Sequence, residues 1–145
     1  MSDSRLLAGE RILLTLWVGG LWAIGYIVAP ALFANLEDRA LAGSLAGVMF
    51  EIIAYVGLLC GGLLLVFNQV RNSRRRFNWR ALVLLLMLLL IAVGQFYLAP
   101  MIAGLRSQGL ADSVQFGRLH GVAASGYLLT SLLGLALVIA GPESD

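Results

Sequence analysis

Four long apolar runs constrain this chain more than any other feature of its sequence. They lie at about 12–33, 45–67, 81–105 and 119–140. A helix needs about 20 predominantly apolar residues to cross the hydrocarbon of a bilayer, and each run is that long. Because lipid offers the backbone no hydrogen-bond partner, each run is expected to be a helix. We therefore predict an all-α fold, an antiparallel bundle of four transmembrane helices, in one integral membrane domain over residues 1–145.

The composition excludes several other classes of protein. The chain is 60% hydrophobic and only 12% charged, which leaves too few polar side chains to coat a soluble domain of 145 residues. Cys60 is the single cysteine, so neither an intramolecular disulfide nor a cysteine zinc site can form. The lipid bilayer is thus the first partner that the sequence predicts.

The segment at 69–80 predicts the orientation in the membrane. It is rich in arginine, and the positive-inside rule places such a loop in the cytoplasm. Both chain termini then also lie in the cytoplasm, in a multi-pass protein of the cell inner membrane. We interpret the cluster as a topology signal with attraction to anionic headgroups, not as a nucleic-acid site. Its arginines are Arg71, Arg74, Arg75, Arg76 and Arg80.

The chain matches itself at an offset of about 70 residues. The run from Tyr26 to Pro30 (Tyr-Ile-Val-Ala-Pro) falls on Phe96 to Pro100 (Phe-Tyr-Leu-Ala-Pro). The offset joins two helix pairs of the same orientation, which is typical of a parallel 2+2 repeat. Pro30 and Pro100 end or kink their helices and free backbone carbonyls, so they mark the outer end as the irregular one.

Small residues recur at helical spacing within the apolar runs. Gly57 and Gly61 form a GxxxG pattern, and Gly19 and Gly20 are further packing candidates. Such residues let helix backbones approach closely. We interpret them first as packing positions inside the bundle, and second as contacts in a homo-oligomer or with another membrane protein.

Few polar side chains near the outer ends could bind a ligand or a metal. Glu51 and His120 occupy near-equivalent repeat positions, and a compact bundle could bring them together. We consider three functional interpretations of these residues: metal binding, a proton relay, and haem ligation by His120. The alternatives are that Glu51 pairs with Arg118 or Arg39 and that His120 forms interfacial hydrogen bonds. The full candidate set is Glu51, His120, Met49, Met101 and Gln95.

Three stretches of the chain resemble known families. Residues 17–20 (Trp-Val-Gly-Gly), 29–33 (Ala-Pro-Ala-Leu-Phe) and 116–122 (Phe-Gly-Arg-Leu-His-Gly-Val) are similar to small bacterial membrane proteins related to the transmembrane protein 205 family. That family's activity is essentially uncharacterised, so the resemblance implies topology more than function. The first stretch also resembles the copper-resistance protein D and membrane protoporphyrinogen oxidase group. In that group a histidine lies about two turns before the tryptophan. The corresponding position in this chain is near Glu10, so the histidine is missing.

Two functional hypotheses follow. The first is a non-enzymatic accessory or assembly component of the membrane. No residue is predicted to be catalytic, because no nucleophile has a base beside it in the sequence. The second is metal (copper-type) or haem handling at an outer site around Glu51 and His120, with a haem-linked redox role left open. The cofactor itself, metal ion or haem, is not specified by the sequence.

Overall fold

The computed structural model describes residues 3–71 and 78–141, and this part of the chain is helical almost throughout. Four helical runs in it are long and apolar enough to cross a membrane, at Ser4–Asn35, Arg39–Arg71, Trp79–Ser107 and Val114–Ala140. The predicted all-α class and the four helices are therefore confirmed. In chain order the elements are α1 (Asp3–Ala23), the π-helix η1 (Ile24–Val28), α2 (Ala29–Asn35), α3 (Arg39–Arg71), α4 (Trp79–Val93), the π-helix η2 (Gly94–Leu98), α5 (Ala99–Ser107) and α6 (Val114–Ala140).

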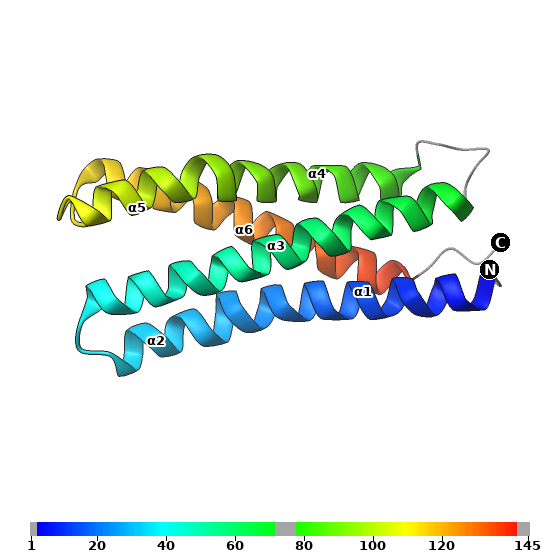
Figure 1. Ribbon diagram of the computed structural model, residues 1–145, viewed down its shortest axis with the longest axis horizontal. Coiled ribbons are helices and arrows are strands. Elements are labelled where there is room, and N and C mark those ends of the chain that lie inside the picture. Colours follow the sequence, from blue (N-terminus) through cyan, green and yellow to red (C-terminus); the bar gives the residue numbers. More distant parts are fainter. Residues whose placement is uncertain (1–2, 72–77, 142–145) are drawn as a thin grey trace.

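The four helical runs form an elongated antiparallel bundle (Figure 1). The first run packs against α3 and α6, and so does the run that contains α4. Helices α3 and α6 are therefore diagonal partners across the bundle. The start of α1 and the end of α6 lie at one end of the molecule, beside the end of α3 and the start of α4. We name this the basic-loop end, and we name the opposite end, where α2 and α5 lie, the proline end.

Each half of the chain contains a π-helix directly before an Ala-Pro pair. Proline lacks an N–H, and its ring clashes with the carbonyl four residues earlier, so the helix widens there. In η1 the Ala29 N–H bonds to the Ile24 carbonyl, and in η2 the Ala99 N–H bonds to the Gly94 carbonyl. The two bulges are 70 residues apart, which is the offset of the sequence repeat. The two halves thus share one order of elements: helix, π-helix, short helix and long helix.

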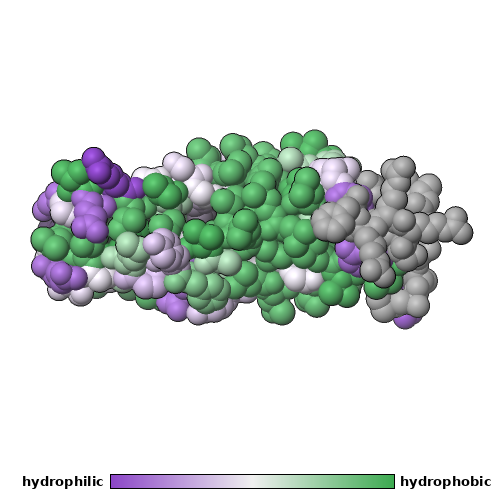
Figure 2. Space-filling model, turned by 90° about the horizontal axis from the view of Figure 1, so that it is seen from above, coloured by the Kyte–Doolittle hydropathy of each residue, from purple (hydrophilic) through white to green (hydrophobic). Residues whose placement is uncertain are grey.

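The centre of the bundle is apolar and closely packed. Trp17, Leu21, Met87 and Leu137 are almost fully buried there. The outward faces are apolar as well, and Figure 2 shows a broad apolar surface over the middle of the molecule, with hydrophilic residues gathered toward its ends. A helix that is apolar all round is typical of a membrane span.

The helices extend beyond the predicted spans at both ends of the bundle, most of all at the start of α1 and at the start of α3. Helix α3 has 33 residues, and at 1.5 Å per residue it is about 50 Å long. Glu51 lies roughly 20 residues from Arg71, or about 30 Å, which is the thickness of the hydrocarbon core. Pro30 and Pro100 lie the same number of residues from Glu10 and Arg80. A bilayer that begins at the basic-loop end therefore ends near these residues, and α3 continues past it.

Candidate functional site

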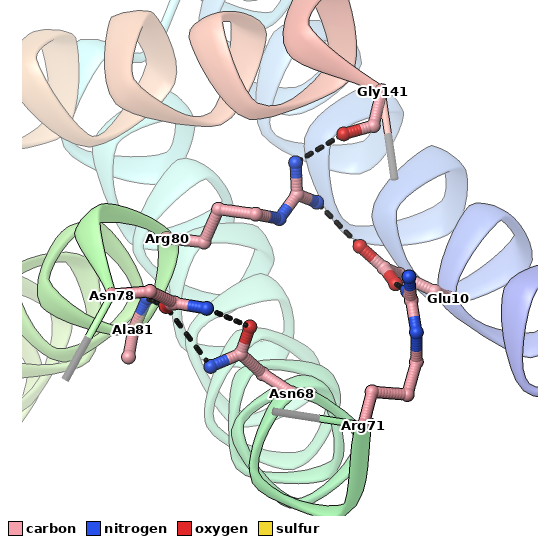
Figure 3. A network of polar contacts seen from close by, with 7 residues as sticks. All are labelled: Glu10, Asn68, Arg71, Asn78, Arg80, Ala81 and Gly141. Atoms are coloured by element: carbon pink, nitrogen blue, oxygen red, sulfur yellow. Dashed lines mark hydrogen bonds and ion pairs between the residues drawn. The ribbon is translucent and has the colours of Figure 1, made fainter. Parts of the chain in front are cut away.

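A buried polar network joins the helices at the basic-loop end (Figure 3). The Glu10 carboxylate accepts a hydrogen bond from Arg71 Nη1 at 2.9 Å and another from Arg80. Arg80 also donates to the backbone carbonyl of Gly141, just after α6. The Glu10 and Arg80 side chains are only 8% and 5% exposed. One carboxylate thus holds together α1, α3 and α4, and through Arg80 also the end of α6.

A pair of amides extends this network on the α3–α4 side. Asn68 and Asn78 exchange hydrogen bonds at 3.0 and 3.1 Å. The Asn78 side chain also accepts from the Ala81 N–H at 2.8 Å, so that it caps the start of α4. A cap of this kind supplies an acceptor that the first turn of a helix lacks. The network therefore fixes where α4 begins relative to α3.

The sequence repeat contains a signal for this network, although none of the predicted ligand residues belongs to it. Glu10 and Arg80 are 70 residues apart, so they occupy the same position in the two repeats. The repeat places an acid in one half and a base in the other, and the bundle brings them together. Arg71 and Arg80, predicted as topology residues, are both in the ion pairs, whereas Arg74, Arg75 and Arg76 lie outside the described residues.

The predicted ligand residues are distributed over several helices near the proline end. Glu51 is exposed on α3, and His120 is exposed on the diagonal helix α6. Within residues 3–71 and 78–141, Glu51 takes part in no ion pair, so neither Arg118 nor Arg39 is its partner. The same residues contain no group of three His, Cys, Asp or Glu side chains placed to hold a metal ion. The remaining candidates are half-buried or exposed: Met49, Gln95 and Met101.

A tyrosine of α6 packs into the bulge of the first helix. The Tyr127 hydroxyl donates to the Leu21 carbonyl at 2.6 Å, just before η1. A Cβ added at Gly25 would lie 2.3 Å from the Tyr127 ring, so the glycine makes room for it. Tyr127 also packs edge-on against Phe50 of α3, with ring centroids 5.0 Å apart. Sequence reasoning did not identify this contact, because no feature of Tyr127 itself distinguishes it from the other tyrosines.

The glycines fall into two groups according to what surrounds them. A Cβ at Gly57 would lie 2.6 Å from Trp17 Nε1, one at Gly61 would lie 2.7 Å from Leu88 Cδ2, and one at Gly20 would meet Ile53 at 2.5 Å. These positions lie at close helix contacts. The second group has nothing within 4 Å of an added Cβ and includes Gly19, Gly62, Gly117 and Gly121.

The fold and its buried polar layer define a small helical-bundle membrane protein. A family model described as Domain of unknown function (DUF4149) matches residues 12–111, which is more than half of the chain. The chain therefore belongs to this family. No curated protein and no solved structure matches it. The resemblances to the transmembrane protein 205 and copper-resistance groups stay interpretations of the sequence.

Proposed function

We propose that the protein is a non-enzymatic component of a membrane assembly and that it binds a partner through the outward face of α6. The supporting observation is a row of small residues that the bundle itself does not use. Gly117, Gly121 and Ser125 are exposed at four-residue spacing, and nothing lies within 4 Å of a Cβ at either glycine. The Ser125 hydroxyl donates to the Gly121 carbonyl at 2.8 Å, so its donor is already satisfied within α6.

The charge beside this row defines the chemistry of the partner. Arg118 lies on the same face as Gly121 and Ser125 and is exposed, and its guanidinium forms no ion pair or hydrogen bond with a described residue. Arg118 is roughly 23 residues from Gly141, so it lies about 35 Å along α6, near the headgroups. The partner is therefore a transmembrane helix with a closely approaching small-residue face and a carboxylate at that depth. Close backbone packing is the usual basis of such contacts in lipid.

Paired glycine substitutions test this proposal. The native complex would be extracted in mild detergent and its size compared for wild type, Gly121→Leu and Gly62→Leu. Gly62 is the matched control, because it is also a helical glycine with nothing within 4 Å of an added Cβ, but on α3. We expect Gly121→Leu to release the monomer and Gly62→Leu to keep the complex, with Arg118→Glu also weakening it.

Two results would count against the proposal. One is a wild-type protein that is monomeric in the native membrane extract. The other is an assembly that contains only copies of this chain, with Glu51 of α3 facing Arg118 of a neighbour. In that case the protein is a homo-oligomer, and the accessory role is wrong.

We further propose that the basic-loop end faces the cytoplasm of the inner membrane. The support is the arginine excess at 69–80 and the positive-inside rule. Reporter fusions within residues 108–112 and after residue 145 test it. Activity of a periplasmic reporter at 145 and not at 108–112 would reverse the orientation.

A further inference from the structure

The two halves of the bundle separate toward the proline end. There α2 packs on α3, and α5 packs on α6, so each half forms its own helical hairpin. Figure 1 shows these two hairpins diverging at this end. Burial follows the same trend along one face of α6: Gly134 is buried, Tyr127 is half-buried, and His120 is exposed, at steps of seven residues. The face that is closed in the middle of the bundle is therefore accessible at its proline end.

One side chain crosses between the two hairpins. Arg106 extends from α5 to α3, where a Cβ at Gly43 would lie 3.3 Å from the guanidinium Cζ and one at Gly47 would lie 3.8 Å from Nη1. The two glycines are one turn apart, and their lack of side chains leaves room for the planar group. The guanidinium Cζ also lies 5.7 Å from the centre of the Phe116 ring on α6. Phe116 in turn stacks on His120, with ring centroids 5.9 Å apart and 5° between their planes.

The positive charge of Arg106 has no counterpart in the described protein. Arg106 is half-buried, yet its guanidinium forms no ion pair or hydrogen bond within residues 3–71 and 78–141. Among the described residues, Trp17 Nε1 is the only fully buried side-chain nitrogen or oxygen that lacks a hydrogen-bond partner. The unpartnered nitrogen atoms of Arg106 are therefore not fully buried. A guanidinium offers five N–H donors in a planar fork that matches phosphate oxygens.

The acidic residues of this end do not neutralise Arg106. The Asp38 carboxylate accepts from the N–H groups of Ala40 and Leu41 at 2.8 and 3.1 Å, so it caps α3. Glu51 lies one turn beyond Gly47 on α3 and is exposed without an ion pair. Glu37 and Asp112 are exposed in the turns that follow α2 and α5.

The depth of Arg106 indicates the source of an anion. Arg106 is roughly 26 residues from Arg80, so it lies about 39 Å along the helical run from the basic-loop end. The hydrocarbon core is about 30 Å thick, and the headgroup layers bring the bilayer to about 40–45 Å. Arg106 therefore lies at the level of the lipid phosphates, while the apolar side chains below it belong to the hydrocarbon level.

We propose that Arg106, with Gly43, Gly47, Phe116 and His120, forms a binding site for the phosphate group of an anionic amphiphile. The phosphate accepts paired hydrogen bonds from the guanidinium, which α3 and Phe116 hold in place. The acyl chain continues toward the exposed apolar residues of α5 below. A free phosphate would satisfy the same donors, and the two sources differ in whether the acyl chain adds affinity.

Titrations with the purified full-length protein in neutral detergent test the site. The probes are dihexanoyl phosphatidylglycerol, dihexanoyl phosphatidylcholine and inorganic phosphate, and the readout is the dissociation constant from tryptophan fluorescence, with phosphorus NMR line width as a second measure. We expect the anionic lipid to bind at least tenfold more tightly than either of the other two. Inorganic phosphate that binds as tightly as the lipid would assign the same site to a free anion and remove the acyl chain from the proposal.

Matched arginine variants locate the binding. Arg106→Gln is expected to weaken binding of the anionic lipid at least tenfold, whereas Arg39→Gln, which removes an exposed arginine at the same end, changes it less than twofold. Arg106→Lys keeps the charge without the fork and is expected to bind several-fold more weakly than wild type; it also decides the matter if Arg106→Gln does not fold. Equal losses in the Arg106 and Arg39 variants, or no loss in Arg106→Lys and Arg106→Gln, would overturn the proposal.

Discussion

Each end of this bundle combines equivalent positions from the two halves of the repeat, but the two ends differ in how their charges are used. At the basic-loop end, Glu10 and Arg80 are buried, Arg71 is half-buried, and the carboxylate pairs with both guanidinium groups. At the proline end, the side chain of Arg106 on α5 lies against Gly47 of α3, and Glu51 follows Gly47 by one helical turn. Neither charged side chain forms an ion pair with a described residue. The first end therefore holds the helices together, and the second keeps charged groups accessible to the surroundings.

The difference has a simple physical basis. A buried charge is tolerated only when it is paired and hydrogen-bonded, so the basic-loop network must be complete. At the headgroup level, water and lipid phosphates solvate a charge, and pairing within the protein is not required. Binding groups can thus persist at the proline end at little cost to the stability of the fold.

The largest expected effect comes from breaking the basic-loop network. Glu10→Gln keeps the shape of the side chain but leaves two largely buried guanidinium groups without their carboxylate. Removing one partner of a buried pair costs about 3–5 kcal/mol. We expect that loss in the free energy of unfolding, measured by tryptophan fluorescence in mixed detergent micelles. The double variant Glu10→Gln with Arg80→Gln should lose less than the sum of the two single losses, and strict additivity would show that the pair is not coupled.

The next effect concerns the close helix contacts in the middle of the bundle. Gly57→Ala places a Cβ 2.6 Å from Trp17 Nε1 and 2.9 Å from Ile91 Cδ1. Overpacking of this kind costs about 1–3 kcal/mol. Gly62→Ala on the same helix meets nothing within 4 Å and is the matched control, expected to stay within about 0.5 kcal/mol of wild type. Equal stability of the two variants would mean that Gly57 is not a packing position.

Much of the fold could be predicted because membrane spans follow from local composition. The four apolar runs specified four helices, and the repeat around Pro30 and Pro100 anticipated irregular helix there, which the structure contains as η1 and η2. The helix ends were less predictable. Helix α3 begins at Arg39, six residues before the expected span, because it continues beyond the hydrocarbon, where apolar composition no longer marks it.

The sites were harder to predict because they depend on which helix faces which. Glu51 and His120 match in the repeat, but equivalent positions of two repeats lie on diagonal helices here, and both side chains are exposed. For Glu10 and Arg80 the same relation gives contact, because these side chains are long and turn toward the bundle axis. Sequence spacing alone does not distinguish the two cases.

A smaller effect is expected at the bulge of the first helix, between the two ends. Tyr127→Phe removes the hydroxyl that donates to the Leu21 carbonyl at 2.6 Å and leaves the ring in place. Hydrogen bonds between helices in membranes contribute about 0.6 kcal/mol on average, and up to about 1.7. We expect a loss of about 1 kcal/mol in the same unfolding assay. Tyr97→Phe, at an exposed tyrosine of η2, is the control and should change nothing.

The smallest expected effect on stability is at the proline end, and it sharpens the comparison between the two ends. Glu51→Gln removes a carboxylate that is exposed and has no ion pair, so the free energy of unfolding should stay within about 0.5 kcal/mol of wild type. The substitution of glutamate by glutamine then lowers the free energy of unfolding by several kcal/mol at Glu10 and leaves it almost unchanged at Glu51. A loss of more than about 1 kcal/mol at Glu51 would mean that this carboxylate is paired within the membrane-embedded protein, with Arg106, whose side chain lies against α3 one turn away, as a candidate. The contrast between a closed end and an accessible end would then fail, and with it the argument that Arg106 is free to bind an external phosphate.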